Sequence, residues 1–122
     1  MKVILYVTSE HTHGVGLRNT LEEVIPKHLL AVFNMVTALS QGLRGPLSDT
    51  ILVLCPAGRE EVQELAVLKE LIRDVRTILI LPNSDRDTLA IGHQFQPRFI
   101  TVPTPGFKDV SKVLAKMLHL KN

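Results

Sequence analysis

The stretch ILVLCPAGREEVQELAVLKELIRDV, residues 51–75, predicts a buried strand, a short turn and an amphipathic helix in that order. Residues 51–55 are an uninterrupted apolar run, which is typical of a strand covered on both faces. From about residue 59 to 73 the apolar side chains recur at helical spacing, as Val62, Leu65, Leu68 and Ile72. A buried strand that leads into such a helix is the repeating unit of a parallel sheet.

The same unit recurs on both sides of this stretch. Further apolar runs lie at residues 3–7, 29–33 and 78–81, and a shorter one lies at residues 99–102. The segments between them predict four more helices. The first of these helices covers residues 17–25 and ends at Pro26, and the second covers residues 36–43 with Asn34 as its N-cap. The third follows a capping box formed by Ser84 and Asp87, and the last covers residues 110–118.

Five strands that alternate with five helices predict one α/β domain spanning residues 1–122. We expect a three-layer, doubly wound parallel sheet with the flavodoxin-like strand order 2-1-3-4-5. In that order, binding sites collect beyond the carboxyl ends of the first and third strands. The loops at residues 8–16 and 55–58 are therefore the expected location of a site.

Composition narrows the possible partners and the compartment. Fourteen basic and twelve acidic residues leave a formal charge of +2, and no Lys/Arg run predicts nucleic-acid binding. A single cysteine excludes an intramolecular disulfide, and no apolar stretch approaches the roughly 18 residues that a membrane span needs. The sequence predicts a cytoplasmic protein with no nucleic-acid or membrane partner.

The order and spacing of these elements resemble a response-regulator receiver, the CheY-like domain of two-component signal transduction. The family carries an acidic, magnesium-binding cluster after its first strand, where this chain has Thr8, Ser9 and Glu10. Cys55 stands where the family has the phosphoacceptor aspartate at the end of its third strand. Pro82 stands where the family has a hydroxyl residue after its fourth strand, and Val102 replaces the lysine of the family's Lys-Pro turn. The resemblance therefore implies a degenerate receiver, or pseudo-receiver.

Aspartyl phosphorylation needs a carboxylate nucleophile, a divalent cation and donors aimed at the developing charge. The resemblance leaves this chain with an uncharged, metal-poor cleft at the corresponding place. We therefore expect a signalling module that is not an enzyme, has no cofactor and acts by phosphorylation-independent protein interaction.

The expected partner surface is the face that the fourth helix, the fifth strand and the fifth helix form together, through which receivers meet partners or dimerise. Ile91, Phe95, Phe99 and Phe107 concentrate large apolar side chains in this part of the chain. They predict a protein partner or a homodimer interface. The alternative is that these side chains fill the core.

Two alternatives use the first loop. Glu10, His11, His13 and Cys55 are candidate ligands for a borderline metal, which would make the switch point a metal or small-molecule sensor. The competing interpretation is that Cys55 packs as an inert small hydrophobe. In addition, His13-Gly14 is similar to the first loop of mannose-type phosphotransferase IIA domains, which implies a phosphohistidine carrier, although the Gly-Ser loop that this family has downstream is missing.

Overall fold

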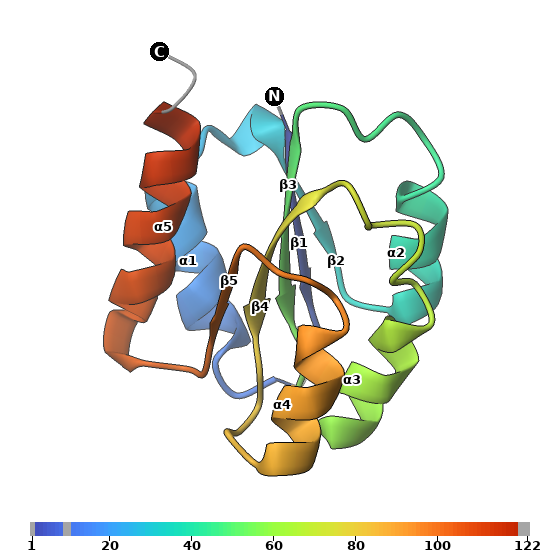
Figure 1. Cartoon of the computed structure of the whole chain (residues 1–122). Coiled ribbons are helices and arrows are strands. Elements are labelled where there is room, and N and C mark those ends of the chain that lie inside the picture. Colours follow the sequence, from blue (N-terminus) through green and yellow to red (C-terminus); the bar gives the residue numbers. More distant parts are fainter. Residues whose placement is uncertain (1, 9–10, 120–122) are drawn as a thin grey trace.

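The computed structural model describes residues 2–8 and 11–119, and within them it has a five-stranded parallel sheet of order β2-β1-β3-β4-β5 (Figure 1). The strands are β1 (Lys2–Val7), β2 (Leu30–Phe33), β3 (Thr50–Cys55), β4 (Arg76–Ile80) and β5 (Phe99–Thr101). The predicted flavodoxin-like order is confirmed. Every strand coincides with one of the apolar runs to within two residues at either end.

Helices cover both faces of the sheet. They are α1 (Gly14–Val24), α2 (Val36–Gly42), α3 (Arg59–Ala66), α4 (Arg86–His93) and α5 (Lys108–His119), with short 3₁₀ turns η1 (Lys27–Leu29) and η2 (Pro105–Phe107). Helices α1 and α5 lie on one face, and α2, α3 and α4 lie on the other (Figure 1).

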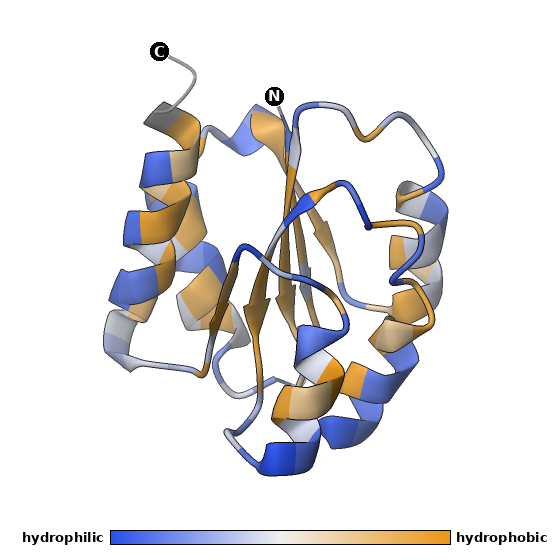
Figure 2. Ribbon diagram, in the orientation of Figure 1, coloured by the Kyte–Doolittle hydropathy of each residue, from blue (hydrophilic) through white to orange (hydrophobic). Residues whose placement is uncertain are grey.

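Alternation along the strands divides the core into two layers. In β1, Val3 and Leu5 pack with residues of α1 and α5, whereas Ile4 and Tyr6 pack with residues of α2 and α3. The central strands are apolar over most of their length, because both of their faces are buried there, whereas polar and apolar residues are interspersed along the helices (Figure 2). No helix within residues 2–8 and 11–119 combines the length and apolarity that crossing a bilayer would demand.

The topology reverses at β1, which pairs with both β2 and β3. In the second pairing Val7 lies opposite Cys55, so the two strands end together at one edge of the sheet. Strands β2 and β5 are the edge strands of the sheet, and each has one neighbouring strand. Strand β5 is three residues long and lies between Pro97 and Pro103.

The third helix is shorter than predicted. Regular α-helix ends at Ala66, and backbone bonds from Val67 to Glu64, from Leu68 to Leu65 and from Leu71 to Leu68 continue the chain as tighter turns. Leu68 and Ile72 are still buried, as the helical spacing required. The tighter turns keep both side chains on the inner side, which is why apolar spacing alone did not reveal the break.

Two predicted caps are absent. The residue at the N-cap of α2 is Met35 rather than Asn34, and no side chain caps that helix. Helix α4 begins after Asp85, also without a side-chain cap, so Ser84 and Asp87 do not form the predicted capping box. The Asn83 side chain instead accepts the backbone N–H of Asp85 and forms a turn before the helix.

Candidate functional site at the carboxyl edge of the sheet

The switch point brings together a thiol and an imidazole that are far apart in sequence. Cys55, the last residue of β3, is 0% exposed, and its Sγ lies 3.4 Å from Nε2 of His11. The first loop therefore folds back over the end of β3, as the topology predicted. Of the other residues expected here, Ser9 and Glu10 lie outside the described part of the chain.

The hydrogen bonds of His11 decide what its Nε2 can do. The backbone N–H of His13 donates to His11 Nδ1 at 3.0 Å, so Nδ1 is an acceptor and carries no proton. The neutral ring then carries its proton on Nε2, where it faces Cys55 Sγ and the backbone of Pro56. Burial, with a smaller contribution from His13, lowers the pKa of His11 and favours this neutral ring. Nε2 thus offers a proton rather than the lone pair that a general base or a metal ligand needs.

The thiol is equally unreactive. Burial, together with the charge of Glu61, raises the pKa of Cys55 to about 12. Since the thiolate is both the nucleophile and the metal ligand, a thiol that stays protonated at neutral pH serves as neither. Among residues 2–8 and 11–119, no three His, Cys, Asp or Glu side chains gather closely enough to hold a metal ion. These properties favour the packing interpretation of Cys55.

A carboxylate from α3 reaches this site, which the sequence had not predicted. Tyr6 is buried in β1 and donates its hydroxyl to Glu61 Oε1 at 2.7 Å. Burial first, and then the hydrogen bond to Glu61, raise the pKa of Tyr6. The charge of Glu61 also influences Cys55 and His11. The expectation of an uncharged cleft was therefore wrong in one respect, because among the described residues the carboxylate of Glu61 approaches it, held by Tyr6.

The remaining positions that match the receiver's functional residues are partly buried. Thr8 follows β1, Pro82 follows the buried Leu81 beyond β4, and Val102 follows β5 and packs on the α2–α4 side of the sheet. Together with Cys55 they present a hydroxyl, a pyrrolidine ring, an alkyl group and a protonated thiol. This set provides neither the nucleophile nor the positive charge that phosphoryl transfer to aspartate requires.

A second polar cluster lies at the corner between β5 and α5 and is centred on the carboxylate of Asp109. Asp109 accepts from Thr101 Oγ1 at 2.6 Å, from Thr104 Oγ1 at 2.9 Å and from the Val110 N–H at 2.8 Å. Burial opposes ionisation, but these hydrogen bonds outweigh it and lower the pKa of Asp109. Two hydroxyl residues ahead of an acidic first turn were the signal for this cluster in the sequence.

The chain turns sharply within this corner. Gly106 and Phe107 both have positive φ, 67° and 49°, and the Gly106 carbonyl accepts a hydrogen bond from Thr20 of α1. Beside the turn lies a groove of about 380 Å³, lined by Thr12, His13, Gly16 and residues 103–107. His13 is exposed in this groove, and its ring centroid is 6.1 Å from that of Phe107.

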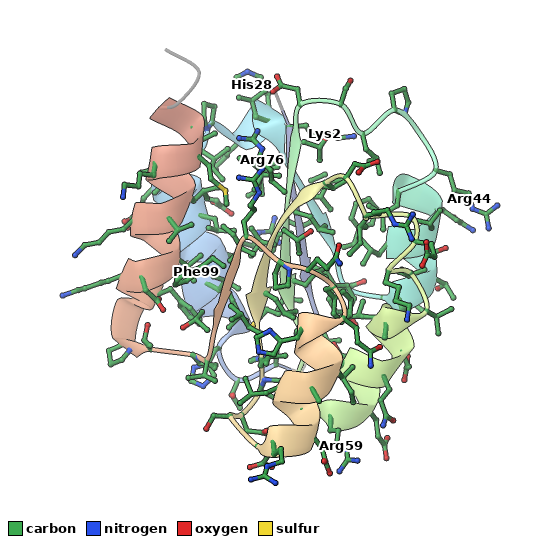
Figure 3. The ribbon with its side chains drawn as sticks, in the orientation of Figure 1. Lys2, His28, Arg44, Arg59, Arg76 and Phe99 are labelled. Carbon is green, nitrogen blue, oxygen red and sulfur yellow. The ribbon has the colours of Figure 1, made fainter. Side chains whose placement is uncertain are left out.

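The four residues of the expected partner face divide between the layers. Phe95 and Phe107 are buried, at 3% and 4% exposed, and belong to different core clusters. Ile91 and Phe99 are half-buried, the first with the α2–α4 layer and the second with the α1–α5 layer. Figure 3 shows Phe99 on β5 beside α5. The sheet separates these side chains, so they do not form one apolar patch.

Comparisons with known proteins agree with the fold. No family model matches the chain, and no curated protein matches its sequence. Among solved structures, a protein assigned to pilus assembly, CpaE from Burkholderia thailandensis E264, superposes with a TM-score of 0.65. The match covers 98% of this chain and 99% of that one, at 16% sequence identity. At this identity the likeness shows the fold alone. That fold is a flavodoxin-like α/β sheet, as the strand order also shows.

Proposed function

We propose that this chain is a receiver-like signalling module that is not an enzyme and acts by protein–protein contact, independently of aspartyl phosphorylation. The observation that carries the proposal is the state of Cys55. It stands at the end of β3, beside the carboxyl end of β1, buried and with its pKa raised to about 12. A receiver would need a charged carboxylate at that point.

The surroundings of Cys55 support the same proposal. The carboxylate of Glu61, which influences the thiol, accepts a hydrogen bond from the Tyr6 hydroxyl, and His11 directs a proton rather than a lone pair toward the thiol. Among the described residues, a phosphoryl group in this cleft would meet the negative charge of Glu61, which disfavours its approach.

The region of α4, β5 and α5 is the contact face that we propose, for a protein partner or a second copy. This region includes the edge strand β5, which has one neighbouring strand, and the long amphipathic helix α5. The structural neighbour is assigned to pilus assembly, and a part in an assembly fits a module that works by contact.

Incubation with acetyl phosphate and Mg²⁺, followed by intact-mass measurement at neutral pH, tests this proposal. We expect no phosphoryl adduct, under conditions in which a receiver that retains its aspartate is fully modified. A stoichiometric adduct would overturn the proposal. An acid-labile adduct that disappears in His13→Ala would instead identify a phosphohistidine carrier.

A further inference from the structure

The outer face of α5 carries a row of lysines, which we call the basic stripe. Lys108, Lys112 and Lys116 are all exposed and recur every four residues, so they follow one line along the helix. Val110 and Leu114, between them in sequence, are buried on the opposite side of the helix. A shallow groove of about 480 Å³ lies on this outer face, lined by Lys112, Val113, Ala115 and Lys116. The stripe therefore combines positive charge with an apolar floor.

The outer face of α3 and of the turns that follow it carries the opposite pattern, which we call the acidic stripe. Glu60 and Glu64 are exposed, again four residues apart. Val67 and Leu71 continue the line and are 81% and 44% exposed, two of the four large apolar side chains most open to solvent within residues 2–8 and 11–119. The stripe therefore combines negative charge with protruding apolar side chains.

Neither stripe is neutralised within the described part of the chain. No ion pair there involves the lysines of the basic stripe or the glutamates of the acidic one. The two arginines that flank the acidic stripe are held elsewhere, Arg59 by Asp87 of α4 at 3.4 Å and Arg73 by Glu70 at 3.0 Å. Figure 3 shows Arg59 at the end of α3 that lies beside α4.

The two stripes cannot meet within one molecule, because α5 and α3 cover opposite faces of the sheet (Figure 1). They do match each other in dimensions. Lys112 and Lys116, like Glu60 and Glu64, are separated by one helical turn, about 6 Å along the axis. The apolar groove on one stripe offers a seat for an exposed apolar side chain such as Val67 on the other.

We propose that the partner of this module is a second copy of the same chain, with the basic stripe of one copy docked on the acidic stripe of the next. This inference rests on the proposed function and names its partner: α5 is the part of the proposed contact face that takes part, and the outer face of α3 is the surface that it meets. The contact joins two different surfaces, so it is head-to-tail, and a pair of copies keeps a free acidic stripe on one copy and a free basic stripe on the other. Because those surfaces lie on opposite sides of the sheet, copies would add in a row.

The expected affinity is low. Two helix faces bury less than the roughly 1,200 Å² of a standard stable interface, which places the contact among weak, reversible ones. Its charged part is screened by salt, since the Debye length falls from about 20 Å at 20 mM to about 4 Å at 500 mM ionic strength. Association should therefore be concentration-dependent and decrease with salt.

Sedimentation velocity of the full chain from about 10 µM to 1 mM, at 20 mM and at 500 mM NaCl, tests the inference over the affinity range of weak contacts. We expect the average mass to rise with concentration at low salt and to approach that of the monomer at high salt. Lys112→Glu/Lys116→Glu and Glu60→Lys/Glu64→Lys should each be monomeric alone, and their equimolar mixture should associate again. The matched control is Lys27→Glu/Arg44→Glu, which changes the charge equally at exposed positions outside both stripes and should associate like the wild type.

Val67→Ser tests the apolar part, because it removes the alkyl side chain without adding a charge to the acidic stripe. The Val67 side chain is exposed, so we expect the thermal midpoint to be unchanged and association to weaken by about tenfold. A wild-type chain that stays monomeric at 1 mM and low salt would overturn the inference, as would a mixture of the two charge-reversed variants that stays monomeric. Either result leaves the proposed function standing, since that depends on the separate absence of a phosphoryl adduct.

Discussion

The end of β3 and the corner between β5 and α5 keep their ionisable side chains in opposite states. Cys55 is buried beside a carboxylate and a histidine N–H, and its pKa rises to about 12. Asp109 receives three hydrogen bonds, and its pKa falls. Both groups lie at the carboxyl edge of one sheet. The comparison shows that the surroundings of a group, rather than its place in the topology, set the direction in which its pKa moves from its ordinary value.

The comparison also separates location from role. In this fold, ligands and reactions collect at the switch point between β1 and β3, where Cys55 lies. The well-supported carboxylate is instead at the last corner, where it holds the loop of Thr101 and Thr104 against the start of α5. Asp109 therefore stabilises the turn that precedes α5, and among residues 2–8 and 11–119 no carboxylate at the switch point accepts three hydrogen bonds.

The largest effect on stability is expected when a carboxylate is placed at the switch point, which would remove the contrast between residue 55 and Asp109. Cys55→Asp buries an acid beside Glu61, and the Nε2–H of His11 that faces this position offsets only part of the cost. We expect the free energy of unfolding at pH 7 to fall by about 4 kcal/mol, as for a carboxyl whose pKa is raised by about three units. Urea denaturation measures this. A variant as stable as the wild type that also takes up a phosphoryl group would mean that the cleft is still built for a phosphoacceptor.

Removing the carboxylate from the corner should have the next largest effect. Asp109→Ala leaves two hydroxyls and an amide without their acceptor, and we expect a loss of about 2 kcal/mol at pH 7. Asp85→Ala is the matched control, because Asp85 stands at the start of α4 without a side-chain cap, and it should cost less than about 0.5 kcal/mol.

The difference in unfolding free energy between the wild type and Asp109→Ala should depend on pH. The pKa of Asp109 is lowered in the folded state, so its stabilisation is present above the unfolded value and is lost as the pH falls through the folded one. The difference between wild type and Asp109→Ala should therefore shrink below about pH 4. A difference that does not change with pH would show that the charge of Asp109 does not contribute.

The smallest effect on stability is expected at alkaline pH, where the thiol of Cys55 itself ionises. The pKa of Cys55 is raised from 9.0 to about 12, so its contribution is complete below pH 9 and is lost as the pH rises toward 12. Between pH 8 and pH 10 the wild type should lose about 1 kcal/mol more than Cys55→Ala, as measured by urea denaturation. Parallel curves for the two proteins would mean that the thiol ionises equally in the folded and unfolded states.

Most of the fold could be predicted because apolar runs report burial directly. Strands covered on both faces need continuous apolar sequence, and residues 51–55 and 78–81 have it. The end of α3 at Ala66 could not be predicted in the same way. An α-helix and a series of tighter turns bury Leu68 and Ile72 alike, so the spacing fits both.

The site was predictable only as far as topology reaches. The approach of His11 to Cys55 follows from the strand order, because both loops leave the same edge of the sheet. The bond from Tyr6 to Glu61 joins residues 55 positions apart and depends on the orientation of two side chains, which no spacing in the sequence reports. Clustering along the chain also misled the prediction of one apolar face, since Phe95 and Phe107 point into opposite layers of the core.

The short strand β5 has a consequence for how such molecules can join. An exposed strand invites another chain to extend the sheet by backbone hydrogen bonding, and prolines and brevity are two ways in which proteins prevent this. With a length of three residues and with Pro97 and Pro103 close to its two ends, β5 offers too little backbone to template a sixth strand. Association on that side is thus directed to side chains on the helices, which can separate again on dilution, and away from the continuous sheets that lead to irreversible aggregates.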